Sequence, residues 1–455
     1  MDVVIVGAGP TGLTLGIDLA RRGVRALVVE RADGLFPGSR GKGIQPRTQE
    51  VFDDLGVLAA VRAAGGPYPA RLIWKDGERL GTQPMFEEIP ADEGTPYTEP
   101  LMVAQWRTQE VLYARLTELG GEVAFGREVT GLEQDAEGVS VRFADGTTVR
   151  ARYVVAADGG RSVIRRALGV GMAGESVDPA SFLVADVRLT GLDRDHWHMF
   201  WASEDSGLAL CPLAGTDCFQ LQGRFPEGIG TELSLDGVRE LVAAYTHLDA
   251  DSVTELRWIS DFRPRTGLAD RFRVGRVFLA GDAAHIHSPA GGQGLNTSVQ
   301  DAYNLGWKLG AVLRDGAPEA LLDTYEEERR PNAADMLGLS TGVHRGEVRR
   351  GQATVQLGLG YRESSLSVDA RTAPAGLRAG DRAPDGTVEG TRLFDAFRGP
   401  HWTLLGASAP GVRSLPAAPE SYGPGVFLVR PDGYVGWAGD STDGLGAYLA
   451  RVGVR

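Results

Sequence analysis

The sequence is poor in cysteine. Cys211 and Cys218 are the only two cysteines among 455 residues, and they lie seven positions apart in strand-like sequence. We interpret them as free thiols in an apolar layer, because a cytoplasmic protein keeps its thiols reduced; a disulfide or redox pair is the alternative. No cluster of histidine and cysteine has the spacing of metal ligands, so no metal site is expected.

Basic residues are outnumbered by acidic ones. There are 47 lysines and arginines against 60 aspartates and glutamates, which gives a net charge of −13. This balance argues against nucleic acid or an anionic membrane as a main partner. The sequence also lacks an apolar stretch of about 18 residues, the length that a membrane-spanning helix needs. Its start has no basic segment typical of a signal peptide, so a cytoplasmic location is expected.

What the sequence does contain is a glycine-rich turn between a strand and a helix near its start. The apolar run 2–6 leads into Gly7, Gly9 and Gly12 in the pattern GxGxxG, and a second apolar run ends on Glu30. This context predicts binding of a dinucleotide, because Gly7 permits a sharp turn, Gly9 lets a pyrophosphate approach the backbone and Gly12 lets the helix pack on the strand. The helix N-terminus then faces the phosphates, and Glu30 accepts hydrogen bonds from a ribose. A glycine turn without a ligand is the alternative.

Two further strand ends carry signals of the same kind. One apolar run ends at Asp158-Gly159, and another ends at Gly281-Asp282. A glycine-rich segment, 290–296, then precedes a long helical pattern. Because glycines before a helix present free N–H groups, this segment is expected to stabilise an anion.

Three cations crowd the loop that follows the first unit. Of Arg40, Lys42 and Arg47, we interpret Arg40 above all as a partner of a pyrophosphate or of an incoming nicotinamide cofactor. A solvated basic loop is the alternative. Gln105 lies at a strand-to-helix junction, where its side-chain amide can reach a ligand.

The middle and the end of the chain differ from the beginning. From 176 to 268 the pattern consists mostly of period-two strands rich in aromatic residues, which favours an antiparallel sheet with one face toward a pocket; a plain sheet core is the alternative. Residues 68–100 indicate an excursion into another domain. The tail after 380 holds short apolar strands and a hairpin turn, and it behaves as an α/β unit of its own.

The three strand-end motifs together resemble the single-component (class A) FAD-dependent aromatic monooxygenases, typified by p-hydroxybenzoate hydroxylase. The resemblance covers about residues 1–350. The tail is similar to the thioredoxin-like C-terminal domain of the branch that includes phenol hydroxylase, polyketide hydroxylases and rifampicin monooxygenase. Since the sequence has no CxxC, the tail is expected to have no redox role.

The resemblance implies a fold of mixed α/β and α+β class, with a Rossmann-like FAD-binding domain, an inserted antiparallel-sheet substrate domain and a C-terminal thioredoxin-like domain. The FAD-binding domain with its helical end is expected to comprise 1–75, 101–175 and 269–370. The substrate-binding sheet is expected to comprise 76–100 and 176–268, and the thioredoxin-like domain 371–455.

The resemblance also implies which residues hold FAD, which is bound non-covalently. The first glycine motif holds the pyrophosphate, Glu30 the adenosine ribose, and Gln105 and Asp282 the ribityl region, while Asp158 and Gly159 touch both FAD and the nicotinamide cofactor. The glycine-rich helix start lies beside N1 and C2=O of the flavin ring, where its N–H groups stabilise the charge of reduced flavin. The cofactor-binding residues expected in this way are Gly7, Gly9, Pro10, Thr11, Gly12, Glu30, Arg31, Arg40, Gln105, Asp158, Gly159, Asp282, Pro289, Gly292, Gly294, Leu295 and Asn296.

The implied activity is hydroxylation of a bulky polycyclic phenol or quinone of polyketide type. NAD(P)H reduces FAD, and reduced flavin with O₂ forms a C4a-hydroperoxide that attacks an electron-rich aromatic carbon; the protein orients the substrate and excludes water. No catalytic residue is assigned, because the flavin does the chemistry. We interpret His285 and His287, which follow a strand end near the flavin, as structural histidines rather than bases.

Other functions stay open at this point. One is an antibiotic-inactivating monooxygenase of the rifampicin type, and another is a non-catalytic flavoprotein that only binds its ligand. A flavin-dependent halogenase is disfavoured because the sequence lacks a WxWxIP motif. The expected partner is a small polycyclic aromatic molecule; the sequence leaves a homodimer open and does not decide between NADH and NADPH.

Overall fold

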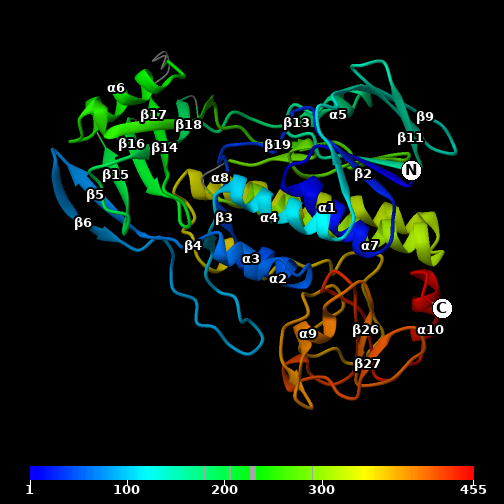
Figure 1. Cartoon of the computed structure of the whole chain (residues 1–455). Coiled ribbons are helices and arrows are strands. Elements are labelled where there is room, and N and C mark those ends of the chain that lie inside the picture. The colour runs from blue at the N-terminus through cyan, green and yellow to red at the C-terminus, as the bar shows by residue number, and fades with distance from the viewer. Residues whose placement is uncertain (179, 202, 204–205, 226–231, 289–290, 455) are drawn as a thin grey trace.

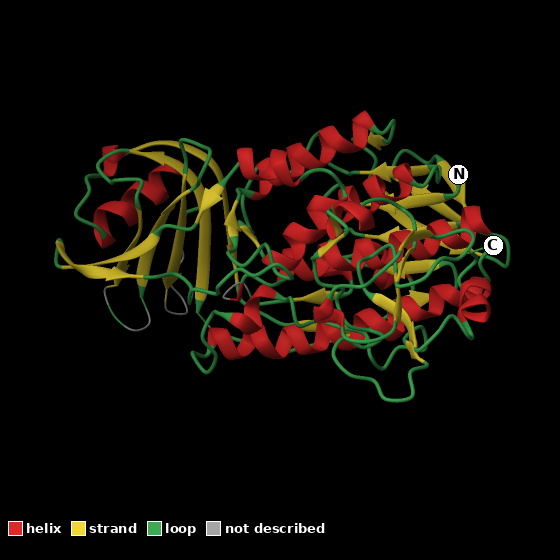
Figure 2. Cartoon of the chain, turned by 90° about the horizontal axis from the view of Figure 1, so that it is seen from below, coloured by secondary structure: helices red, strands yellow, loops and turns green. Residues whose placement is uncertain are grey.

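The computed structural model describes residues 1–455 except 179, 202, 204–205, 226–231, 289–290 and 455. Figure 1 shows a central body of sheet and helices, a large, mostly antiparallel sheet at one end of it, and a smaller unit formed by the last part of the chain. In Figures 1 and 2 both termini lie at the end opposite the large sheet. Within the described residues, no helix is both long and apolar enough to cross a bilayer.

The body is built on a six-stranded sheet. In sheet order its strands are β20 (Arg273–Val274), β21 (Val277–Leu279), β12 (Tyr153–Ala156), β1 (Val3–Val6), β2 (Ala26–Val29) and β8 (Glu122–Ala124). All neighbours pair in parallel except β20 and β21. Strand β1 is buried along its whole length, as expected for an apolar strand that is covered on both faces.

Helices cover this sheet, and α1 lies between α4 and α7 while it packs on β1 and β2 (Figure 1). The helices of the body are α1 (Pro10–Arg21), α2 (Pro46–Asp54), α3 (Leu58–Ala63), α4 (Gln105–Glu118), α5 (Val163–Ala167), α7 (Gly294–Gly310) and α8 (Thr324–His344). Three small sheets complete it: β9 (Val129–Gln134) with β10 (Val139–Phe143) and β11 (Thr148–Ala151); β13 (Met172–Ala173) with β19 (Gly267–Ala269) and β22 (His285–Ile286); and β3 (Gly43–Ile44) with β7 (Leu101–Met102) and β4 (Gly66–Pro67).

The large sheet has seven strands, and helix α6 (Leu235–Tyr245) packs on one face of it. In sheet order the strands are β18 (Val253–Phe262), β14 (Ser181–Leu189), β17 (Phe219–Phe225), β16 (Gly207–Pro212), β15 (His196–Trp201), β5 (Ala70–Lys75) and β6 (Glu78–Gln83). Strand β5 pairs in parallel with β15 and in antiparallel fashion with β6. The boundary predicted between 75 and 76 therefore cuts through a hairpin that belongs wholly to this sheet.

The last part of the chain forms a unit with a sheet of its own. The strands of this sheet, in sheet order, are β23 (Val368–Asp369), β29 (Val435–Gly439), β28 (Val426–Val429), β26 (Thr403–Leu405) and β27 (Arg413–Leu415). The unit also contains a hairpin of β24 (Thr387–Val388) and β25 (Thr391–Arg392) and the helices α9 (Leu393–Phe397) and α10 (Leu445–Arg451). Strand β23 lies just before the predicted boundary at 371. Trp307 of α7 packs into the apolar core of this unit beside Trp402 and Trp437, so the unit is docked on the body.

Candidate active site

The carboxyl ends of three neighbouring parallel strands open into one cavity. Strands β1, β12 and β21 are adjacent in the sheet, and the loops after them carry Gly7, Asp158 and Asp282. Ligands of open α/β sheets bind at this edge. The cavity extends to the seven-stranded sheet and has a volume of about 1670 Å³. Because small-molecule sites usually measure about 300–1,000 Å³, this space suits a large cofactor together with a second large molecule.

Most of the predicted cofactor residues line this cavity. Gly12 and Asn296 do not reach its wall, and the predicted Pro289 lies outside the described residues. The predicted residues on the wall are Gly7, Gly9, Pro10, Thr11, Glu30, Arg31, Arg40, Gln105, Asp158, Gly159, Asp282, Gly292, Gly294 and Leu295.

The three glycines of the first motif meet different surroundings. Gly7 has φ +110°, and a Cβ there would lie 2.3 Å from the carbonyl oxygen of Ala157. A Cβ on Gly12 would lie 2.0 Å from the carbonyl oxygen of Gly7, so this glycine allows α1 to pack on β1. Around Gly9, in contrast, no described atom lies within 4 Å of the Cβ position. Gly9 therefore leaves a free surface at the start of α1, where a phosphate can approach the helix N-terminus.

Glu30 is held at the end of β2 by two backbone N–H groups. Ala8 donates to its Oε2 at 2.9 Å, and Ala32 donates to its Oε1 at 3.1 Å. The bond from Ala8 ties the carboxylate to the glycine-rich turn, the bond from Ala32 ties it to the segment after β2, and each oxygen keeps a further lone pair. The side chain is thus fixed at the cavity wall in a position to accept hydrogen bonds from a ligand hydroxyl.

Asp158 offers an acceptor that the described part of the chain does not use. Its Oδ2 accepts a hydrogen bond from the N–H of Val163 at 2.7 Å, whereas Oδ1 is buried and has no partner there. Burial raises the pKa of Asp158. The next residue, Gly159, has φ +79° and no described atom within 4 Å of its Cβ position, so the backbone is also open to a ligand.

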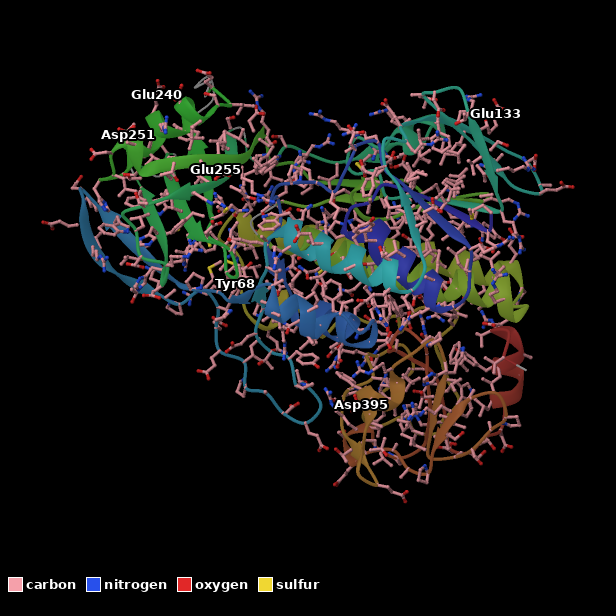
Figure 3. All side chains as sticks on the ribbon, viewed as in Figure 1. Tyr68, Glu133, Glu240, Asp251, Glu255 and Asp395 are labelled. Carbon is pink, nitrogen blue, oxygen red and sulfur yellow. The ribbon has the colours of Figure 1, made fainter. Side chains whose placement is uncertain are left out.

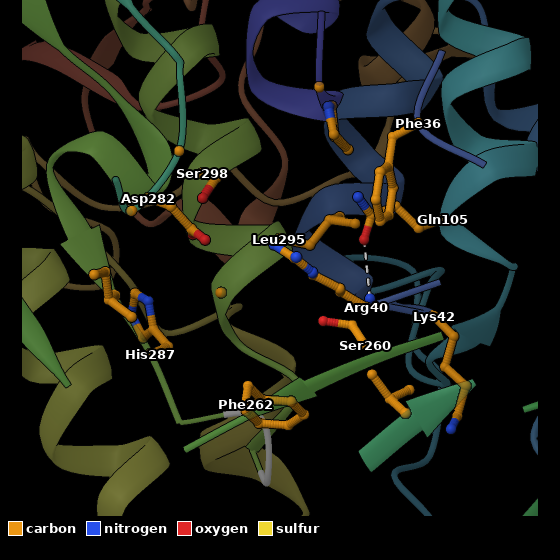
Figure 4. A pocket seen from close by; sticks show the side chains of 18 of the residues that line it. Phe36, Arg40, Lys42, Gln105, Ser260, Phe262, Asp282, His287, Leu295 and Ser298 are labelled. Atoms are coloured by element: carbon orange, nitrogen blue, oxygen red, sulfur yellow. Dashed lines mark hydrogen bonds between the residues drawn. The ribbon is translucent and has the colours of Figure 1, made fainter. Parts of the chain in front are cut away.

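Asp282 lies in a short turn after β21 and lines the cavity (Figure 4). Asp282 is exposed at the cavity surface; desolvation by the surrounding protein raises its pKa, and the charges of His285 and Arg40 oppose that shift. Asp301 of α7 accepts the N–H of Gly281 at 2.9 Å, and it also binds His285 Nε2 at 2.5 Å. These bonds fix the turn and hold the buried His285 against α7.

The start of α7 forms the floor of the cavity. Gly292 has φ +62°, and Gly294 and Leu295 line the wall. The side chain of Asn296 points into the protein: its Oδ1 accepts the N–H of Gln45 at 2.8 Å, and its Nδ2 donates to the carbonyl of Gly43 at 2.9 Å. Asn296 thus ties the helix start to β3, which is the physical reason why it does not line the cavity.

Arg40 and Lys42 of the loop before β3 and Arg47 in the first turn of α2 point in different directions. The guanidinium of Arg40 lies over the rings of Phe36 and Trp258, at 5.5 and 5.9 Å, and extends into the cavity (Figure 4). Gln105 accepts the N–H of Gly41 at 3.0 Å and so holds this loop.

Arg47 and Lys42 are held by partners of their own, away from Arg40. Arg47 is buried and pairs with Glu50 at 2.6 Å. Lys42 turns toward the seven-stranded sheet, where it donates a hydrogen bond to Gln220 Oε1. The sequence places all three cations in one loop, but these directions depend on partners that are distant in the chain.

Comparisons with known proteins agree with this geometry. A family model described as an FAD binding domain matches residues 1–340. A flavin-dependent monooxygenase of Mycobacteroides abscessus is 46% identical over 99% of this chain and 100% of its own length. A rifampicin monooxygenase of Rhodococcus hoagii is 33% identical over 99% of this chain and 97% of its own length. The crystal structure of a ternary complex of aklavinone-11 hydroxylase with FAD and aklavinone has a TM-score of 0.83 at 29% identity, with coverage of 100% and 99%.

The chain therefore belongs to the class A FAD-dependent monooxygenases. The predicted fold class, FAD as cofactor with NAD(P)H and O₂, and the enzymatic activity are confirmed. The site itself fits FAD, because it offers the free surface at Gly9, the unused acceptor on Asp158 and the carboxylate of Glu30 along one cavity. Which single residues contact FAD stays a prediction.

Glu30 gives a direct test of that prediction. If it binds the adenosine ribose, Glu30→Ala removes a charge-assisted hydrogen bond of about 1.5–3 kcal/mol, so the Kd of FAD should rise about 10- to 100-fold. The measurement is titration of the apoprotein with FAD, followed by quenching of flavin fluorescence. Glu30→Gln is the matched control, because it keeps one acceptor and should lose less affinity. An unchanged Kd in Glu30→Ala would place the ribose elsewhere.

Proposed function

We propose that the protein hydroxylates a bulky polycyclic aromatic substrate, such as a phenol or quinone of polyketide type. The observation that carries the proposal is the composition of the two cavity walls. The FAD-motif residues form one wall, and apolar side chains of the seven-stranded sheet, among them Phe182, Trp197, Met199 and Phe262, form the other. Phe182 and Phe262 contact each other with ring centroids 5.7 Å apart. Flat apolar surfaces of this kind suit a fused ring system.

When bound, FAD accepts a hydride from NAD(P)H and activates O₂ for transfer of one oxygen atom to the substrate. The chain supplies binding, orientation and exclusion of water. In this proposal Gly9 and the N-terminus of α1 hold the pyrophosphate, and the first turn of α7 directs N–H groups at the negative charge of the reduced ring. Asp282 accepts hydrogen bonds from the ribityl chain. The sheet wall shields the reaction from water, which suppresses wasteful release of peroxide.

A second function, oxidative inactivation of an antibiotic, is favoured by the 33% identity with a rifampicin monooxygenase. It requires the same cofactor chemistry and differs only in the substrate and in the fate of the product. Product analysis separates the two functions, because an inactivated antibiotic loses potency against a sensitive strain, whereas a biosynthetic intermediate gains one oxygen and is carried forward.

The test of the proposed function is anaerobic stopped-flow reduction of the FAD-loaded protein by NADPH and by NADH, with and without a panel of polycyclic phenols. We expect at least one phenol to accelerate flavin reduction by about tenfold or more, since a monooxygenase avoids consuming NAD(P)H without substrate. If bound flavin is not reduced under any condition, the protein only binds its ligand and the proposal is wrong.

We further infer that the partner is a small molecule and not nucleic acid, because the net charge is −13. The cytoplasmic location and a homodimer stay predictions. The assignment of FAD to the body and of the substrate to the seven-stranded sheet is likewise part of this proposal.

A further inference from the structure

Lys42 is a buried cation on the substrate side of the cavity. The residue is 7% exposed, and it lines the cavity with its ammonium 4.2 Å from the centre of the Trp197 ring. Figure 4 shows it directed away from Arg40, although the two residues are separated only by Gly41. Lys42 therefore lies in the part of the cavity next to the seven-stranded sheet.

The charge of Lys42 has no ion-pair partner in the described part of the chain. Its ammonium donates to the neutral amide of Gln220, and no described carboxylate lies within 4.0 Å. Lys308, which is also buried, has such a partner, because Glu328 lies 2.7 Å from its ammonium. An unpaired buried ammonium is costly, and burial accordingly lowers the pKa of Lys42. An anion that enters this part of the cavity would relieve that cost.

A second cation faces the same space. Arg350 follows α8 and lines the cavity, and it donates to the sulfur of Met85 at 3.5 Å. It is close enough for its charge to lower the pKa of Lys42 further. The one carboxylate whose charge favours protonated Lys42 is Asp186 on β14, which lies outside the cavity wall. Lys42 and Arg350 thus place two cationic side chains on the wall at this end of the cavity, and Asp186 does not reach that wall.

Aromatic side chains surround these two cations. Tyr68 lies where the seven-stranded sheet meets the body (Figure 3), and its ring contacts Phe86 and Trp197 with centroid distances of 5.1 and 6.4 Å. All three rings line the cavity. Aromatic side chains that can pack against fused rings thus lie next to cations that can bind an anionic oxygen.

We propose that this end of the cavity, which we name the Lys42 compartment (Lys42, Tyr68, Phe86, Trp197, Gln220 and Arg350), selects polycyclic aromatic ligands that carry an anionic oxygen. The oxygen belongs to a carboxylate, a phenolate or an enolate, and Lys42 is the residue that determines the preference. This inference rests on the proposed function, since it names the class of substrate within it.

The experiment compares two probes of equal shape, anthraquinone-2-carboxylate and anthraquinone-2-carboxamide. Their Kd values are measured by isothermal calorimetry on the FAD-loaded protein and on Lys42→Met, Lys42→Arg and Lys75→Met. The chain has only three lysines, and Lys75 is an exposed one outside the cavity, which makes it the matched control. Wild type should bind the carboxylate at least about tenfold more tightly than the carboxamide, as expected for one charge-assisted hydrogen bond.

In Lys42→Met this ratio should fall to about one, with the Kd of the carboxamide changed by less than about twofold. Lys42→Arg and Lys75→Met should keep the preference. Lys42→Gln, whose amide still reaches Gln220, replaces Lys42→Met if that variant does not fold, and its ratio should also fall to about one. Equal affinities in wild type, a preference that survives loss of Lys42, or failure of both probes to bind would each overturn the inference. Normal reduction of FAD by NADPH in the same samples separates this failure from failure of the proposed function.

Discussion

Gly9→Val should abolish tight binding of FAD and leave the apoprotein folded. The Cβ position of Gly9 has no described atom within 4 Å, so the side chain fits the empty protein but occupies the space that we assign to the pyrophosphate. We expect the Kd of FAD to rise at least about 100-fold, which corresponds to about 2.7 kcal/mol. The apoprotein should lose at most about 1 kcal/mol, because Gly9 is the N-cap of α1 and valine is a poor N-cap. Fluorescence titration with FAD and thermal melts of the apoprotein measure the two effects.

Two other glycines serve as controls for this prediction. Gly358 also has open space at its Cβ position but lies outside the cavity, so Gly358→Val should bind FAD normally. In Gly12→Val the new Cβ would meet the carbonyl oxygen of Gly7 at 2.0 Å, so this variant should unfold or lose stability before FAD binding is tested. If Gly9→Val binds FAD like wild type, the pyrophosphate does not lie against the start of α1.

The part of the site that the sequence predicts well is local in the chain. Each strand end with its glycine or aspartate is encoded within about ten residues, and parallel pairing then brings β1, β12 and β21 to one edge of a sheet. The positions of Gly9 and Asp158 on the cavity wall can therefore be predicted from sequence patterns alone. The general rule that ligands bind at the carboxyl ends of parallel strands is enough to predict that these motifs lie close together.

The part that the sequence does not predict depends on distant partners. Lys42 and Arg47 lie within seven residues of Arg40 in the sequence, but the hydrogen-bond partner of Lys42 is 178 residues away and Arg47 donates to the carbonyl of Asp432, 385 residues away. No local pattern distinguishes these cations. The same holds for β5, whose parallel pairing with β15 moves it from the FAD-binding body to the large sheet. Long-range pairing, not local propensity, decides these cases.

Glu328→Gln should give the largest loss of stability of any single polar substitution that we consider. Glu328 of α8 is fully buried and accepts hydrogen bonds from Arg430 at 2.7 and 2.9 Å and from Lys308 at 2.7 Å. Asp432 balances the second positive charge at 2.6 Å from Arg430. Loss of one carboxylate leaves a buried positive charge without compensation, which costs about 3–5 kcal/mol. Since Arg430 and Asp432 belong to the C-terminal unit, that unit should detach first. Urea unfolding and limited proteolysis around residues 369–380 measure both effects.

The matched control is Glu133→Gln, which removes an ion pair with Arg142 on the surface (Figure 3). Both side chains there are more than half exposed, so the change should cost no more than about 1 kcal/mol. If Glu328→Gln unfolds at the same urea concentration as Glu133→Gln, the buried cluster does not hold the C-terminal unit in place.

The pH dependence of unfolding is a second test of the buried ion pairs among Lys308, Glu328, Arg430 and Asp432. Burial raises the pKa of Glu328, but the charges of Arg430 and Lys308 outweigh it and hold the pKa well below its ordinary value of 4.5. A carboxyl whose pKa is lower in the folded than in the unfolded protein binds fewer protons when folded, so it stabilises the fold above pH 4.5 and loses this contribution as the pH falls further. Wild type should therefore lose stability between pH 5 and pH 3 more steeply than Glu328→Gln. Because glutamine does not titrate, parallel slopes in the two proteins would show that other carboxyl groups cause the acid sensitivity.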